Sequence, residues 1–197
     1  MEDETPLSEQ ESLALIARMI NKVKCDYEES GLSTLLWGGV ITFCSIVSFI
    51  AFEIDKPWLY NVWDLTILAV IIQVIVVIRE NRRKKYRSHS DAIMGGIWIS
   101  FGTSMFLISF YASKFQIPHA NALYLIVYGI PTFATGLSRG FKPMIYGGLA
   151  CWALAIASMY TQDGYTFLYS AVAAQVAWFI PGLILRKRYQ KAKSGNV

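Results

Sequence analysis

Charged residues are scarce in this sequence. Asp, Glu, Lys and Arg make up 16% of the 197 residues, whereas soluble domains usually contain about 25%. Hydrophobic residues make up 54%. This composition argues against an ordinary soluble domain and predicts an all-α protein embedded in a membrane as a bundle of helices.

Histidine and cysteine are also rare, and this limits the chemistry of the chain. The two histidines, His89 and His119, and three widely spaced cysteines show no metal-ligand spacing and cannot complete a Ser/His/Asp triad within a bilayer. The sequence contains no P-loop, GxSxG or HExxH motif. We predict no metal, no cofactor, no catalytic residue and no enzymatic activity. Glu53, Asp55 and Asp64 are the only carboxylates placed for acid–base chemistry.

Six long apolar stretches are present, and each approaches the roughly 20 residues that a membrane-spanning helix needs. They cover residues 32–52, 62–78, 92–111, 120–137, 144–160 and 165–185. Breakers or charges separate them, as in DKPWLYN, SKFQIPH, SRGFKP and TQDG. We expect a cytoplasmic segment at 1–31, a transmembrane domain of six helices at 32–185, and a basic cytoplasmic tail at 186–197.

The distribution of Lys and Arg predicts the orientation of these helices. If the N-terminus is cytoplasmic, 16 of the 18 Lys and Arg residues lie on the cytoplasmic side, and two, Lys56 and Lys114, lie on the other side. Positively charged loops are preferentially kept in the cytoplasm. A multi-pass protein with both termini in the cytoplasm is therefore expected.

The densest positive charge is in RENRRKKYRSHSD, residues 79–91, which holds six of the 18 Lys and Arg residues. The most closely spaced are Arg82, Arg83, Lys84, Lys85 and Arg87. As a short loop between two predicted spans, this segment is expected first of all to fix the topology. Anionic lipid, a cytoplasmic protein and the chain's own N-terminal helix are the alternative partners, and nucleic acid is disfavoured because the loop is too short to form an independent binding surface.

The segment before the first span has the pattern of an amphipathic helix. Ser8 and Glu11 have capping-box spacing, and an apolar stripe that includes Ile16, Ile20 and Val23 follows at steps of three and four. The first 31 residues hold eight acidic and three basic side chains, a net charge of −5. Anionic lipid would repel this segment, so we expect it to dock on a cytoplasmic protein or on the basic loop of residues 79–91.

Glycine pairs mark the cytoplasmic ends of three predicted spans and are expected to serve helix packing. They are Gly38 and Gly39, Gly95 and Gly96, and Gly147 and Gly148. A glutamine or proline follows each pair after a similar number of residues, which suggests three repeated helical hairpins. The alternative is that glycine pairs and prolines are simply common in membrane helices.

Four residues are candidates for a solute pathway or for helix kinks: Gln73, Pro131, Gln175 and Pro181. A proline frees a backbone carbonyl, and that carbonyl can bind a neighbour, a water or a permeating solute. Structural kinks and hydrogen bonds between helices are the simpler interpretation.

Several motifs resemble those of a known group of proteins. They are LSEQESLALIARMINKVK, LLWGG, YGIPTFATG, FKPMIYGGLACW and AWFIPG with its basic tail. With these motifs, the chain resembles a family of uncharacterised small six-helix integral membrane proteins of bacteria. The resemblance implies six helices in the bacterial cytoplasmic (inner) membrane and no particular chemistry.

Two functions are compatible with these patterns. The first is a non-enzymatic regulator, scaffold or accessory subunit that engages another protein through its cytoplasmic face. The second is a small permease or channel-like protein, which could be a homo-oligomer, with the four pathway candidates facing its substrate.

Overall fold

The structure is a computed structural model that describes residues 31–83 and 89–194. All regular secondary structure in these residues is helical, and they contain no strand. The prediction of an all-α helix bundle is therefore confirmed for this part of the chain. The predicted amphipathic helix before the first span lies outside the described residues.

The first two long helices are joined by a short 3₁₀ helix. Helix α2 covers Leu32–Glu53, η1 covers Pro57–Asp64, and α3 covers Leu65–Arg83. The proline at the start of η1 suits a first helical turn, where no backbone donor is needed. The indole Nε1 of Trp63 donates a hydrogen bond to the Ser48 Oγ at 2.8 Å, which fixes η1 against α2. Most of the predicted loop DKPWLYN is therefore helical.

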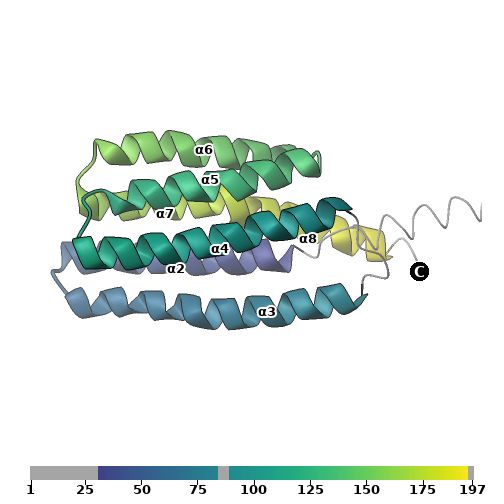
Figure 1. The fold of residues 1–197 in the computed structure, drawn as a ribbon, viewed down its shortest axis with the longest axis horizontal. Coiled ribbons are helices and arrows are strands. Elements are labelled where there is room, and N and C mark those ends of the chain that lie inside the picture. Colours follow the sequence, from purple (N-terminus) through teal and green to yellow (C-terminus); the bar gives the residue numbers. More distant parts are fainter. Residues whose placement is uncertain (1–30, 84–88, 195–197) are drawn as a thin grey trace, which may run out of the picture.

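Three further helices follow in the middle of the chain. Helix α4 covers His89–Phe115, α5 covers Ala120–Ser138, and α6 covers Lys142–Met159. The turn between α5 and α6 contains Gly140 at φ +60°, a conformation that glycine adopts without strain. Helices α5 and α6 pack side by side along their lengths (Figure 1).

The last helical rod changes its geometry halfway. It consists of η2 (Asp163–Tyr165), α7 (Thr166–Ala174), η3 (Gln175–Phe179) and α8 (Ile180–Ser194), and η3 is a π-helix. Pro181 follows η3 and has no backbone N–H to bond the carbonyl four residues earlier, so the regular α-helical ladder cannot continue through this point. Helix α8 runs without a break across the boundary predicted between residues 185 and 186.

The helices lie roughly parallel or antiparallel to one another (Figure 1). In the apolar stretches of α2, α5 and the α7–α8 rod, 33%, 44% and 44% of residues are buried, against 6% for α3 and none for α4. Helices α3 and α4 therefore lie at the periphery. The buried core residues, drawn from α2, α5, α6 and the last rod, are Ile41, Leu125, Tyr128, Cys151, Ala155, Ala173, Ala174, Ala177 and Trp178.

Five helical stretches among the described residues are long and apolar enough to cross a membrane: Leu32–Glu53, Pro57–Arg79, Ala92–Phe115, Ala120–Ser138 and Thr166–Lys191. Large apolar side chains on the peripheral helices are exposed, as with Ile99 at 73% and Phe106 at 70%. These features suit lipid contact, and the protein is a membrane protein. The stretch 144–160, predicted as the fifth of six spans, falls in α6, which has 18 residues and is not among the five.

Candidate functional site

At the π-helix η3, the last rod packs closely against both α2 and α6. A Cβ atom at Gly38 of α2 would lie 2.7 Å from the Phe179 backbone N, and a Cβ at Gly147 of α6 would lie 2.7 Å from the Ala177 Cα. A Cβ atom essentially never lies this close to an atom of a neighbouring helix. The backbone of η3 is therefore held between two glycines on neighbouring helices, as expected for close packing in a membrane.

The six glycines predicted to serve packing have different surroundings. Gly38, Gly147 and Gly148 lie directly against other helices; a Cβ at Gly148 would lie 2.7 Å from the Phe133 Cβ on α5. At Gly39, Gly95 and Gly96, by contrast, a Cβ would meet no described atom within 4 Å. The three predicted hairpins therefore do not use their glycine pairs in the same way.

Trp178 of η3 is the centre of a buried aromatic and polar cluster. Its side chain is 2% exposed. Its Nε1 donates to the Thr132 Oγ1 on α5 at 2.8 Å, and that hydroxyl donates to the Tyr128 carbonyl at 2.7 Å. The Trp178 ring centroid lies 4.8 Å from that of Tyr128 and 6.1 Å from that of Phe101 on α4. The cluster therefore connects α4, α5 and η3 through ring contacts and one hydrogen bond of the indole.

The two predicted mid-membrane glutamines both bind helix α2. The Gln175 Nε2 donates to the Thr42 Oγ1 at 2.9 Å, and the Gln73 Nε2 donates to the Ser33 Oγ at 3.0 Å. Ser33 and Thr42 are nine residues apart, so the two contacts are separated by about 14 Å along the helix. The Gln73 Oε1 is buried and has no hydrogen-bond partner among the described residues.

The four pathway candidates are not brought together around one cavity in the described part of the chain. Pro131 and Pro181 are both less than 2% exposed and pack within the bundle. Gln73 belongs to peripheral α3, whereas Gln175 lies in η3 in the core. Their observed surroundings are those of helix-packing residues.

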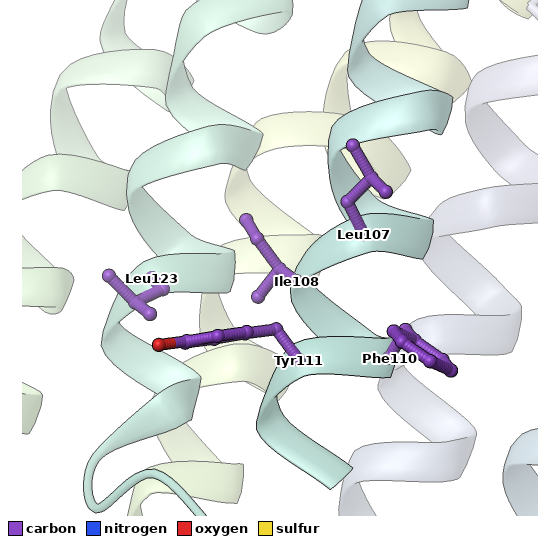
Figure 2. A pocket seen from close by; sticks show the side chains of 5 residues that line it. All are labelled: Leu107, Ile108, Phe110, Tyr111 and Leu123. Atoms are coloured by element: carbon purple, nitrogen blue, oxygen red, sulfur yellow. The ribbon is translucent and has the colours of Figure 1, made fainter. Parts of the chain in front are cut away.

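A shallow groove of about 360 Å³ lies elsewhere, between α4 and α5. It is lined by Leu107, Ile108, Phe110, Tyr111 and Leu123. Figure 2 shows the Tyr111 ring extending from α4 toward Leu123 on α5. With an almost wholly apolar lining, the groove is better suited to a hydrocarbon chain than to a polar solute.

Charged side chains lie at the two ends of the bundle. The exposed carboxylates of Glu53, Asp55 and Asp64 are near η1, at one end. Basic residues of α3, the α5–α6 turn and α8 are at the opposite end, where α8 extends beyond its neighbours (Figure 1). Among the described residues, no group of three or more His, Cys, Asp or Glu could hold a metal ion.

The predicted cytoplasmic interaction residues are only partly within the described chain. Arg82 is exposed near the end of α3, and Arg83 is the last residue of that helix. Ile16, Ile20, Val23, Lys84, Lys85 and Arg87 lie outside the described residues.

The cluster around Trp178 was not predicted from the sequence. Its members Tyr128, Thr132 and Trp178 lie in YGIPTFATG and AWFIPG, two motifs on which the family resemblance depends. Tyr128 and Thr132 are four residues apart and so share a helix face, which was the available signal. Nothing in the sequence indicated that this face meets Trp178.

We expect the Gln175–Thr42 hydrogen bond to contribute measurably to stability. Replacing Gln175 with Leu and Thr42 with Val, singly and together, should reveal a coupling of about 0.5–1.5 kcal/mol, the range for hydrogen bonds between membrane helices. The measurement is the free energy of unfolding in mixed micelles titrated with a denaturing detergent. Strictly additive effects would contradict the contact.

No family model, no curated protein and no solved structure matches this chain, so its function has to be argued from its own residues.

Proposed function

We propose that the protein is a non-enzymatic accessory or regulatory subunit of the bacterial cytoplasmic membrane that engages a cytoplasmic protein. The proposal is based on the hydrogen bonds that polar side chains form between the helices. The amides of Gln73 and Gln175 and the indole of Trp178 donate to hydroxyls on neighbouring helices. In the described part of the chain these donors are used to bind neighbouring helices, which favours a function at the surface.

The proposed topology has six spans and two cytoplasmic termini. Helix α5 ends at the basic end of the bundle and α7 begins at the opposite end, so α6 has to pass between them (Figure 1). An 18-residue helix is about 27 Å long, close to the thickness of the hydrocarbon core. The clustering of Lys and Arg at one end supports a cytoplasmic position for that end.

The proposed contact surface includes the apolar stripe of the N-terminal segment and the basic loop of residues 79–91. An amphipathic helix that carries net negative charge is better suited to a protein surface than to anionic lipid. This assignment depends on the sequence pattern.

In the experiment, the full-length chain is cross-linked to its neighbours in native membranes, and the proteins recovered with it are compared between variants. In the variant, Ile16, Ile20 and Val23 are all replaced by Ser, and a matched control carries Ala14→Ser, Ala17→Ser and Asn21→Ser. Because the apolar stripe is expected to supply the contact, we expect a cross-linked partner to be recovered with wild type and control and lost with the stripe variant.

The unfolding temperature of the purified protein should be the same for all three chains, since the substitutions lie before the bundle. Identical cross-linked partners for the stripe variant and wild type would contradict the proposed function.

A further inference from the structure

Two basic segments that are distant in the sequence meet at one end of the bundle. The guanidinium carbon of Arg188 in α8 lies 5.1 Å from the centroid of the Phe141 ring, at the start of α6. Phe141 is buried, whereas its neighbour Lys142 and Arg188 itself are exposed. The ring thus holds a cation of α8 near the α5–α6 turn, and an ordered guanidinium loses less conformational freedom when it binds an anion.

One side of α8 changes from apolar to basic along the helix. Ile180 and Leu183 are 48% and 43% exposed, and Lys187 and Lys191 are exposed further along. Steps of three and four residues place these side chains on a common face. This face is complementary to a phospholipid. Its apolar part suits the acyl chains, and its basic part suits the anionic phosphate.

No described carboxylate side chain lies beside the positive charge at this site. Neither Lys142 nor Arg188 forms an ion pair with any carboxylate whose side chain the structure describes. The described carboxylate side chains, Glu53, Asp55 and Asp64, lie at the other end of the bundle. Among the side chains that the structure describes, no carboxylate therefore competes with an external anion for these cations.

We propose that Lys142 and Arg188, together with Lys187 and Lys191, bind the phosphate headgroup of an acidic phospholipid whose acyl chains lie along Ile180 and Leu183. Guanidinium and ammonium groups form charge-assisted hydrogen bonds with phosphate oxygens. The apolar residues directly before the cations favour a lipid over free phosphate or an acidic peptide, neither of which would cover them. The inference depends on membrane embedding and is independent of the proposed protein partner.

The test measures lipid retention by the full-length protein in a neutral detergent, using native mass spectrometry. The probes are phosphatidylglycerol and phosphatidylcholine with identical acyl chains. Each cation near a headgroup contributes about a fivefold preference for an anionic lipid. The double variant Lys142→Gln/Arg188→Gln should therefore lose about 25-fold of the wild-type preference for phosphatidylglycerol.

The matched control is Lys56→Gln/Lys114→Gln at the opposite end, where Lys114 also lies over a ring, 5.6 Å from the Phe115 centroid. It removes the same charge and should keep the wild-type preference. A second variant, Lys187→Gln/Lys191→Gln, should lose preference like the first while its unfolding temperature stays unchanged.

Three results would overturn the proposal. One is equal retention of phosphatidylglycerol by wild type and the Lys142/Arg188 variant. Another is complete displacement of the lipid by millimolar inorganic phosphate, which would indicate a site for the free anion. The third is no headgroup preference in wild type, as expected if an acidic segment of the chain occupies the site.

Discussion

Replacing Gly38 with Leu is expected to prevent stable folding of the bundle. The Cβ would lie 2.7 Å from the backbone N of Phe179 and 2.9 Å from its Cα. Backbone atoms cannot rotate away as a side chain can. Helix η3 also cannot move back, because Gly147 of α6 is equally close on another side, with a Cβ position 2.7 Å from the Ala177 Cα.

The alanine variant makes this prediction quantitative. Gly38→Ala should lower the free energy of unfolding by about 1–3 kcal/mol, the usual cost of overpacking, and Gly38→Leu should cost more. The measurement is detergent-induced unfolding of the purified protein, together with its yield from membranes.

The adjacent residue is the control. A Cβ at Gly39 meets no described atom within 4 Å, so Gly39→Ala should be neutral or stabilise the helix by up to about 1 kcal/mol through its higher helix propensity. Equal losses for the Gly38 and Gly39 variants would show that η3 does not contact α2 as described.

The positions of the helices along the chain could be predicted from the sequence, but which helices pack against one another could not. Apolar length and turn residues such as Gly140 located the long helical segments, because both are local properties. Which helix lies in the centre could not be predicted, since the stretches are apolar on all sides and lack a polar face. Helix α4 resembles the others in hydropathy, yet none of the residues in its apolar stretch is buried.

The same limitation applies to identical motifs. The pairs at Gly38–Gly39 and Gly95–Gly96 look alike in sequence, yet Gly38 contacts η3, whereas a Cβ at either glycine of the second pair would meet no described atom within 4 Å. A glycine permits close approach, but whether another helix approaches depends on tertiary arrangement. Gln73 and Gln175 could be identified from the sequence because each is a polar residue within an apolar stretch. Their acceptors, Ser33 and Thr42, could be identified only in three dimensions.

Trp178 is expected to be the side chain whose loss costs the most stability in the core. Trp178→Ala should lower the free energy of unfolding by about 3–5 kcal/mol, because it leaves a large cavity and removes the ring contacts with Tyr128 and Phe101.

Thr132→Val keeps the shape of the threonine and leaves the indole N–H without its acceptor. For this variant we expect a loss of about 1–2 kcal/mol, again measured by detergent-induced unfolding.

Thr132 accepts one hydrogen bond from Trp178 and donates another to the Tyr128 carbonyl. The contribution of the first bond can be measured by removing its donor. In a Trp178→Phe background no N–H remains, so adding Thr132→Val should cost less than it does in wild type. Thr103→Val is the control, because the Thr103 hydroxyl is exposed and donates only to the Ile99 carbonyl of its own helix; its effect should stay within about 0.5 kcal/mol. If Thr132→Val costs as much in the Trp178→Phe background as in wild type, the stabilisation comes from the bond of Thr132 to the Tyr128 carbonyl, and the link between α5 and η3 depends on ring packing alone.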